Sequence, residues 1–171
     1  MGLLCASCTI SPSHQTVNSC PVAVSPVSHT DFSFAPVIAD AATALYNDIN
    51  LQQHGLSKEA FDYAWKGYEN LLKKNMISRS NYLTICDFSQ SSKKKRLYII
   101  DVDNSKLVTN TYVAHGKNSG AEFANSFSNK PESLQSSLGF YITDNTYIGT
   151  HGLSLRINGV DPGYNDKALM R

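Results

Sequence analysis

Basic residues are absent from the first third of this chain, and long apolar runs are absent from all of it. The sequence has 171 residues, and its 15 Lys and Arg residues all lie at or after Lys58. The formal net charge of +1 gives no long-range attraction toward nucleic acid or an anionic membrane. No window of about 18 residues is uniformly apolar, so we expect no transmembrane segment.

Complete sets of catalytic residues are absent as well. No Ser lies in a nucleophile-elbow pattern, and the acidic residues are scattered along the chain instead of being paired. The segment 116–120 has two glycines four positions apart, which is too little for a phosphate-binding loop. From the residues alone we therefore expect no complete catalytic set and no cofactor.

The four cysteines do not form a recognisable metal-binding pattern. Cys5 and Cys8 make one CxxC, whereas a zinc site normally needs two such pairs or a paired His set. We expect unpaired thiols and no metal; the alternative is a metal-binding arm built on Cys5, Cys8, Cys20 and His14. Lipidation at this CxxC is a weaker hypothesis, because Gly2-Leu3-Leu4 departs from the small residues that precede a lipidated Cys. Cys86 lies in an apolar run without an adjacent base and is expected to be a small buried hydrophobe.

The first two regions of the chain differ in composition and periodicity. Residues 1–35 are rich in Ser, Thr, Pro, Val and Cys, and we predict an irregular leader or signal-peptide remnant. Residues 36–80 are predicted to be a helical extension. Its first helix opens at Pro36 and ends near Gly55. Its second helix is capped by Ser57 and carries a core-facing stripe of Phe61, Trp65, Tyr68 and Leu72.

Residues 81–171 are predicted to be a β domain. Three strands are expected first, at 82–88, 96–102 and 106–114, of which the last two form a hairpin. Residues 136–163 then give two or three antiparallel strands, with a turn at 144–145 and a corner at 150–152. In that stretch Leu153, Leu155 and Ile157 alternate with polar residues and so share one face. The predicted fold class is α+β, with two helices followed by a mainly antiparallel sheet.

Two histidines of the predicted β domain are candidates for chemistry. His115 and His151 each follow a strand and precede a glycine, and His151 lies between Gly149 and Gly152. Because no Asp, Glu or Cys stands at ligand spacing beside either one, a hydrogen-bonded structural role is the favoured interpretation of both.

A series of short motifs runs in order along the later part of the chain. These are Gly55-Leu56-Ser57-Lys58-Glu59-Ala60-Phe61, Cys86-Asp87-Phe88-Ser89, Arg96-Leu97-Tyr98-Ile99-Ile100-Asp101, Tyr112-Val113-Ala114-His115-Gly116, Asn118-Ser119-Gly120, Phe127-Ser128-Asn129, Ser136-Ser137-Leu138-Gly139-Phe140-Tyr141, Gly152-Leu153-Ser154-Leu155-Arg156 and Asn165-Asp166-Lys167-Ala168. On these motifs the segment 56–171 resembles the L,D-transpeptidase catalytic-domain family (YkuD-like), in its murein branch with a helical N-terminal extension.

The resemblance implies a sandwich-like, mainly β catalytic fold in an exported protein of the bacterial periplasm or cell envelope. It also implies that the substrate and partner is the stem peptide of peptidoglycan. The implied mechanism uses a Cys thiolate that forms a thioester, a His base and backbone amides that bind the oxyanion. Donor and acceptor specificity and oligomeric state are left open by the sequence.

The chain departs from the family pattern at its end. In the family the catalytic His lies on a strand just after the position of Arg171, and a Ser-x-Gly-Cys segment lies further on. The expectation is therefore an incomplete, inactive enzyme in which neither role passes to His151 or Cys86. A non-catalytic cell-wall binding module is the alternative. The candidates for lining the donor cleft are His115, Ser119, Ser137, Tyr141, His151 and Arg156.

Overall fold

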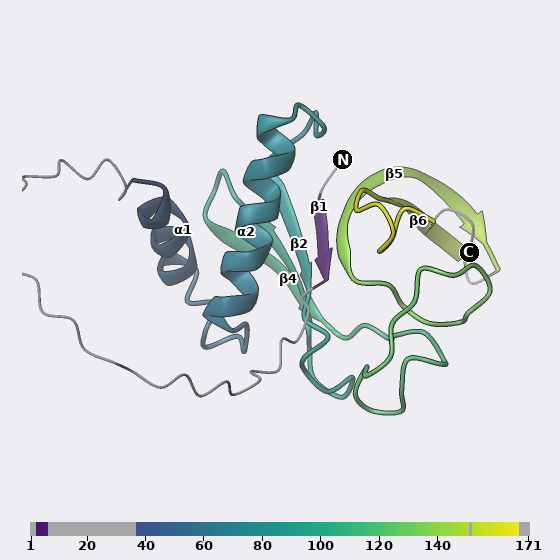
Figure 1. Cartoon of the computed structure of the whole chain (residues 1–171). Coiled ribbons are helices and arrows are strands. Elements are labelled where there is room, and N and C mark those ends of the chain that lie inside the picture. Colours follow the sequence, from purple (N-terminus) through teal and green to yellow (C-terminus); the bar gives the residue numbers. More distant parts are fainter. Residues whose placement is uncertain (1–2, 7–36, 151, 168–171) are drawn as a thin grey trace, which may run out of the picture.

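The computed structural model describes residues 3–6, 37–150 and 152–167, and it has the predicted α+β class (Figure 1). Helix α2 lies across one face of a mainly antiparallel sheet, and helix α1 packs beside it. The described strands form one six-stranded sheet in the order β4-β3-β2-β1-β5-β6. The elements are β1 (Leu3–Ala6), α1 (Val37–Asp48), α2 (Lys58–Lys73), β2 (Tyr82–Cys86), β3 (Leu97–Asp101), β4 (Lys106–Thr111), β5 (Gly139–Gly149) and β6 (Gly152–Gly159).

The second helix begins where its cap predicts. The side chain of Ser57 accepts a hydrogen bond from the backbone N–H of Ala60 at 3.2 Å, which satisfies one of the free amides of the first turn. The predicted stripe also faces the core, with Phe61 fully buried and Tyr68 5% exposed. The first helix is shorter than predicted and ends at Asp48. Asn50 adopts a left-handed φ of 57°, so the chain leaves the helix there and continues as turns to Gly55.

The core lies between α2 and the middle of the sheet. Leu83 pairs with Ile100, and Ile85 pairs with Tyr98, in the antiparallel register of β2 and β3. All four side chains are fully buried because directly opposed residues share one face. They pack with Phe61 from α2.

The prediction of an irregular leader over residues 1–35 is wrong for Leu3–Ala6. These residues form β1, which runs parallel to β2 and antiparallel to β5. An apolar run suits a strand with a neighbour on each side. Its backbone N–H and C=O groups pair with those of β2 and β5, which would otherwise lack a partner strand on that side. Cys8, His14 and Cys20 of the metal-binding alternative lie outside the described residues, and the division into three regions stays a prediction.

The last two strands also differ from the prediction. The expected turn at 144–145 is a register shift between Thr143 and Thr146 within one long strand, β5. The bulge bends the strand without ending it. The alternating apolar residues of β6 do not enter the core, since Leu153 is 75% exposed and Leu155 is 51% exposed. Leu153 faces Ile148, which is 80% exposed, so the outer part of this hairpin carries an apolar stripe on its surface.

Replacing Gly67 in α2 by Ala should destabilise the protein, although Ala is better than Gly in a helix by about 1 kcal/mol. A Cβ at this position would lie 1.9 Å from Cε1 of Phe140. The Phe140 ring is itself stacked on Tyr63 at a centroid distance of 5.3 Å. We expect a net loss of about 1–3 kcal/mol in urea unfolding. A second change, Phe140→Leu, should recover part of that loss, and unchanged stability of the single variant would contradict this packing.

Exchanging the exposed pair Ile148 and Leu153 for Thr should reduce self-association of the protein. An exposed apolar stripe beside an edge strand favours contacts between molecules, while surface substitutions usually change stability by less than about 0.5 kcal/mol. Light scattering over a concentration series measures the first effect, and a thermal melt measures the second. Ser154→Thr, on the opposite face of the same strand, is the matched control. Equal scattering by all three proteins would show that the stripe does not associate.

Candidate functional site

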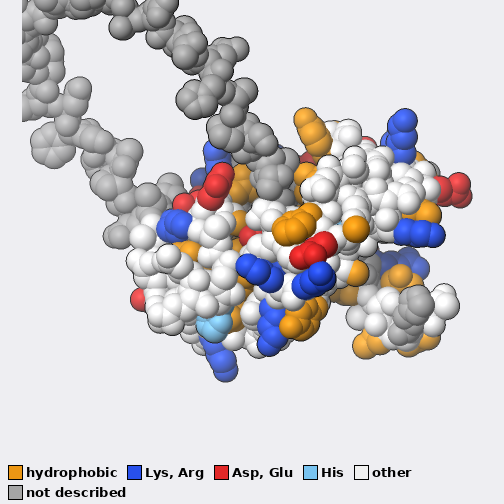
Figure 2. Space-filling model, turned by 90° about the horizontal axis from the view of Figure 1, so that it is seen from below, with side chains coloured by type: hydrophobic (Ala, Val, Ile, Leu, Met, Phe, Trp, Pro, Cys, Tyr) orange, Lys and Arg blue, Asp and Glu red, His pale blue; other side chains and the backbone are white. Residues whose placement is uncertain are grey.

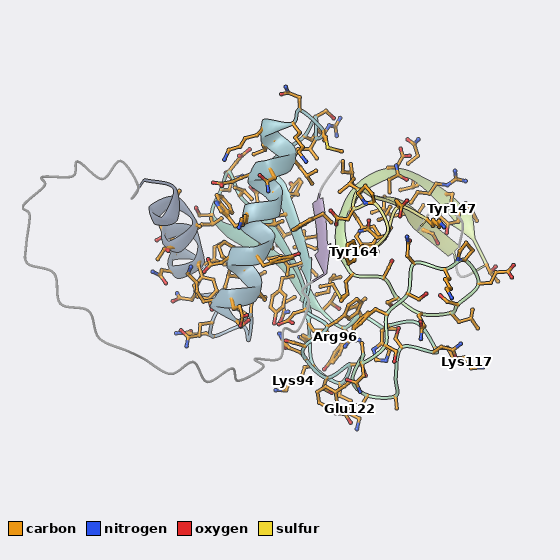
Figure 3. The ribbon with its side chains drawn as sticks, viewed as in Figure 1. Lys94, Arg96, Lys117, Glu122, Tyr147 and Tyr164 are labelled. Carbon is orange, nitrogen blue, oxygen red and sulfur yellow. The ribbon has the colours of Figure 1, made fainter. Side chains whose placement is uncertain are left out.

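The candidate site is built from two loops, residues 87–96 between β2 and β3 and residues 112–138 between β4 and β5. These loops lie together at one end of the sheet (Figures 1 and 3). A backbone hydrogen bond from Ser92 N–H to Glu122 O at 2.9 Å ties the two loops together. Another, from Ser128 N–H to Ser136 O at 3.0 Å, folds the second loop onto itself. Seen from this end, basic side chains are interspersed with acidic and apolar ones (Figure 2), so this face does not present a field of one charge.

Arg96 lies at the centre of these loops, and its side chain is fully buried. Its Nη1 donates to the carbonyl of Gln90 at 2.9 Å, and its Nε and Nη2 donate to the carbonyl of Val113 at 3.2 and 3.0 Å. The guanidinium also lies 5.1 Å from the centre of the Phe88 ring, a cation–π distance. Burial lowers the pKa of Arg96, while the nearby Cys86 and Asp87 raise it.

His115 is half-buried and has a hydrogen-bond partner at each ring nitrogen. Its Nδ1 lies 2.8 Å from Nη2 of Arg96, and its Nε2 lies 3.1 Å from the carbonyl oxygen of Gly120. The second of these contacts is on the solvent side. The ring therefore closes the segment 115–120 onto the buried guanidinium, in agreement with the hydrogen-bonded role favoured by the sequence.

Ser119 joins this segment to the one that precedes β5. The Ser119 side chain, 1% exposed, accepts from the N–H of Ser136 at 2.8 Å, and Ser136 Oγ accepts from the N–H of Gly116 at 2.9 Å. Next to it, Ser137 and Tyr141 are hydrogen-bonded through their hydroxyls, and Tyr141 also donates to the carbonyl of Ser137 at 2.9 Å. Ser119, Ser137 and Tyr141 are almost fully buried, so they hold the loops in place from the interior of the protein.

Of the last two candidates, only Arg156 is described, and it lies apart from this group. Arg156 is exposed on β6 and stacks over Tyr147, with 5.3 Å between its guanidinium carbon and the ring centre. Tyr147 projects from the hairpin at some distance from Arg96 and Lys117 (Figure 3). His151 lies outside the described residues. The structure therefore brings His115, Ser119, Ser137 and Tyr141 together but leaves Arg156 separate.

Two further residues hold the start of β5, and the sequence analysis did not single them out. Asn165 is fully buried; it donates to the carbonyl of Phe140 at 2.8 Å and accepts from the N–H of Asp161 at 2.8 Å. The carboxylate of Asp161 accepts from the N–H of Phe140 at 2.6 Å. A turn at Asp161-Pro162-Gly163 is visible in the sequence, but its partner in β5 is not.

Cys86 does not have the surroundings of a nucleophile. It is 4% exposed, and burial raises the pKa of its thiol from 9.0 to about 12. The positive charge of Arg96 lowers this pKa and the carboxylate of Asp87 raises it, and both effects are smaller than that of burial. The sequence-based expectation of a small buried hydrophobe agrees with this position.

The described part of the chain holds neither a group of metal ligands nor a membrane-spanning helix. No three His, Cys, Asp or Glu side chains come together there in a group able to hold a metal ion. Neither described helix is long and apolar enough to cross a membrane.

Cys86 should react slowly with iodoacetamide in the folded protein. At pH 9 about half of ordinary thiols are thiolate, but a pKa of about 12 leaves roughly one Cys86 in a thousand ionised. Mass spectrometry of the Cys86 peptide measures the modification, with urea-unfolded protein as the control. Because the folded pKa lies above the unfolded one, the contribution of this thiol to stability is present below pH 9 and is lost as the pH rises toward 12. Equal rates in folded and unfolded protein would contradict the burial of this thiol.

Comparison with known proteins adds one match. The model of a family described as the L,D-transpeptidase catalytic domain matches residues 52–171, which contain α2, the strands from β2 to β6 and all the loops of the candidate site. Searches of curated proteins and of solved structures gave no match to this chain. Since the matched span is well over half of the sequence, the chain belongs to the L,D-transpeptidase catalytic domain family.

Proposed function

We propose that this protein works as an L,D-transpeptidase-type cysteine acyltransferase on peptidoglycan stem peptides, in the periplasm or cell envelope. The observation that carries the proposal is the family match over 52–171. The described fold is consistent with it, because the loops at one end of the sheet are fixed by buried hydrogen bonds and can present groups to a peptide without reorganising.

The proposed reaction has two steps. A thiolate attacks the carbonyl carbon of an L-to-D peptide bond in the donor stem, the amine leaves with a proton supplied by a His, and a thioester remains. An acceptor amine then attacks the thioester and gives a proton back to the His, and the thiolate leaves.

We propose, further, that residues 1–171 do not supply the Cys and the His of these steps. Two observations on described side chains support this: Cys86 is buried with a raised pKa, and both ring nitrogens of His115 are already engaged.

In this proposal the described loops form one wall of the donor cleft. His115 reaches its solvent-facing edge, while the buried side chains Ser119, Ser137 and Tyr141 hold the backbone in place. Arg156 is proposed to line a more distant part of the same cleft, where a guanidinium suits the carboxylates of a stem peptide. His151, outside the described residues, stays a candidate for the cleft.

A non-catalytic cell-wall binding module is the second candidate. It is favoured by the absence, among the described side chains, of a thiol hydrogen-bonded to a base. Such a module would use the same loops to hold stem peptides and would leave them unchanged.

The two candidates differ in turnover. A synthetic tetrapeptide with an L-to-D bond, incubated with an acceptor amine and residues 1–171, should give no exchange product and no acyl adduct by intact-protein mass spectrometry. Residues 1–171 fused to the His- and Cys-containing C-terminal segment of another family member should give both. Exchange by residues 1–171 unaided would contradict the proposed lack of a nucleophile in them. Binding to purified peptidoglycan without exchange by the fused chain would favour the binding module.

A further inference from the structure

A buried guanidinium is costly, and its contacts identify what it does. Removing an ion from water costs several kcal/mol unless polar partners replace the water. Arg96 is fully buried, yet neither of the two ion pairs among the described residues includes it. The carboxylate of Asp87 is occupied by Ser89 and Gln90. Apart from the Phe88 ring, the Arg96 side chain contacts two backbone carbonyls and the ring of His115.

These contacts fix the tautomer of His115. A guanidinium has only donors, so Nδ1, at 2.8 Å from Nη2 of Arg96, must carry the lone pair. A carbonyl oxygen only accepts, so Nε2, at 3.1 Å from the oxygen of Gly120, must carry the hydrogen. The ring is therefore neutral, with its proton on the nitrogen that faces solvent.

We propose that Arg96 is a positioning residue that holds His115 as a hydrogen-bond donor for acceptor oxygens of the stem peptide. The proposal rests on the proposed function, since it takes the loop 115–120 as part of the donor cleft. It assigns His115 a role different from that of a base: Nε2 already carries a proton and cannot take another, whereas it can donate to a peptide carbonyl or carboxylate.

The loop 115–120 fixes the direction of this donor at the solvent side of the ring. Nε2–H is held by the carbonyl of Gly120, at the solvent side of the ring. Gly120 has a φ of +148°, and a Cβ there would lie 2.0 Å from the carbonyl oxygen of Phe123. A glycine is thus required for the turn that brings this carbonyl to the ring. A peptide oxygen that takes the place of the carbonyl, or shares the hydrogen with it, finds the donor already oriented.

The tautomer is tested without any substrate. Nitrogen-15 spectra of the full chain at neutral pH report which ring nitrogen of His115 carries the hydrogen. We expect Nε2–H in the wild type, and a mixture of tautomers in Arg96→Met, which fills the space but offers no donor. Lys94→Gln, which removes an exposed neighbouring charge, is the control and should leave the ring unchanged. If Arg96→Met does not fold, as judged by a thermal melt, Arg96→Gln replaces it; because the Gln amide offers both a donor and an acceptor, a mixture of tautomers is expected there as well. A wild-type ring protonated on Nδ1, or a ring unchanged by loss of the guanidinium, overturns the proposal.

The donor role is tested by binding of the synthetic tetrapeptide. His115→Phe should weaken binding about tenfold, the loss expected for one hydrogen bond. His115→Gln places an amide N–H near the position of Nε2 and should weaken it less than about threefold. Equal binding by the Phe variant overturns the donor role while leaving the proposed function intact. If the wild type shows the expected tautomer but does not bind the peptide, the proposed function fails, and the donor role fails with it.

Discussion

The loop end of this protein depends on the burial of one positive charge. Arg96 stands just before β3, and its guanidinium draws together carbonyls from the loop after β2 and the segment after β4. If either carbonyl moves away, a buried N–H of Arg96 loses its partner, which costs more than the hydrogen bond itself contributes. His115 is hydrogen-bonded to the same guanidinium, so the arrangement of the candidate site depends on the position of Arg96.

Phe140 links these loops to the helical layer. Its ring lies against Gly67 and Tyr63 of α2, and its backbone N–H and C=O are held by Asp161 and Asn165. Apolar contact on one side and charge-assisted hydrogen bonding on the other therefore act on a single residue at the start of β5. Ser137 and Tyr141 lie on either side of this point and are hydrogen-bonded to each other.

The sequence predicts the parts of the fold whose causes are local. The cap at Ser57, the stripe of α2 and the hairpin of β3 and β4 all follow from neighbouring residues, and the structure confirms them. The strand at Leu3–Ala6 was missed because four residues are too few for a periodicity, and its partners lie about 80 and 140 positions away. Arg96 was read as an ordinary strand residue for the same reason: a strand pattern shows alternation, whereas the burial of its charge depends on carbonyls brought by other segments.

In the described part of this chain, the surroundings of Cys86 and His115 suit structural support and do not suit a nucleophile and its base. A thiol becomes a nucleophile when its surroundings favour the thiolate. At Cys86 the opposing effects are burial and the carboxylate of Asp87, and the charge of Arg96 does not overcome them. That same charge instead orients the imidazole of His115. A group that would activate a thiol in an open cleft is thus used here to hold a donor in place. Under the proposed function, the nucleophile is therefore a thiol less buried than that of Cys86.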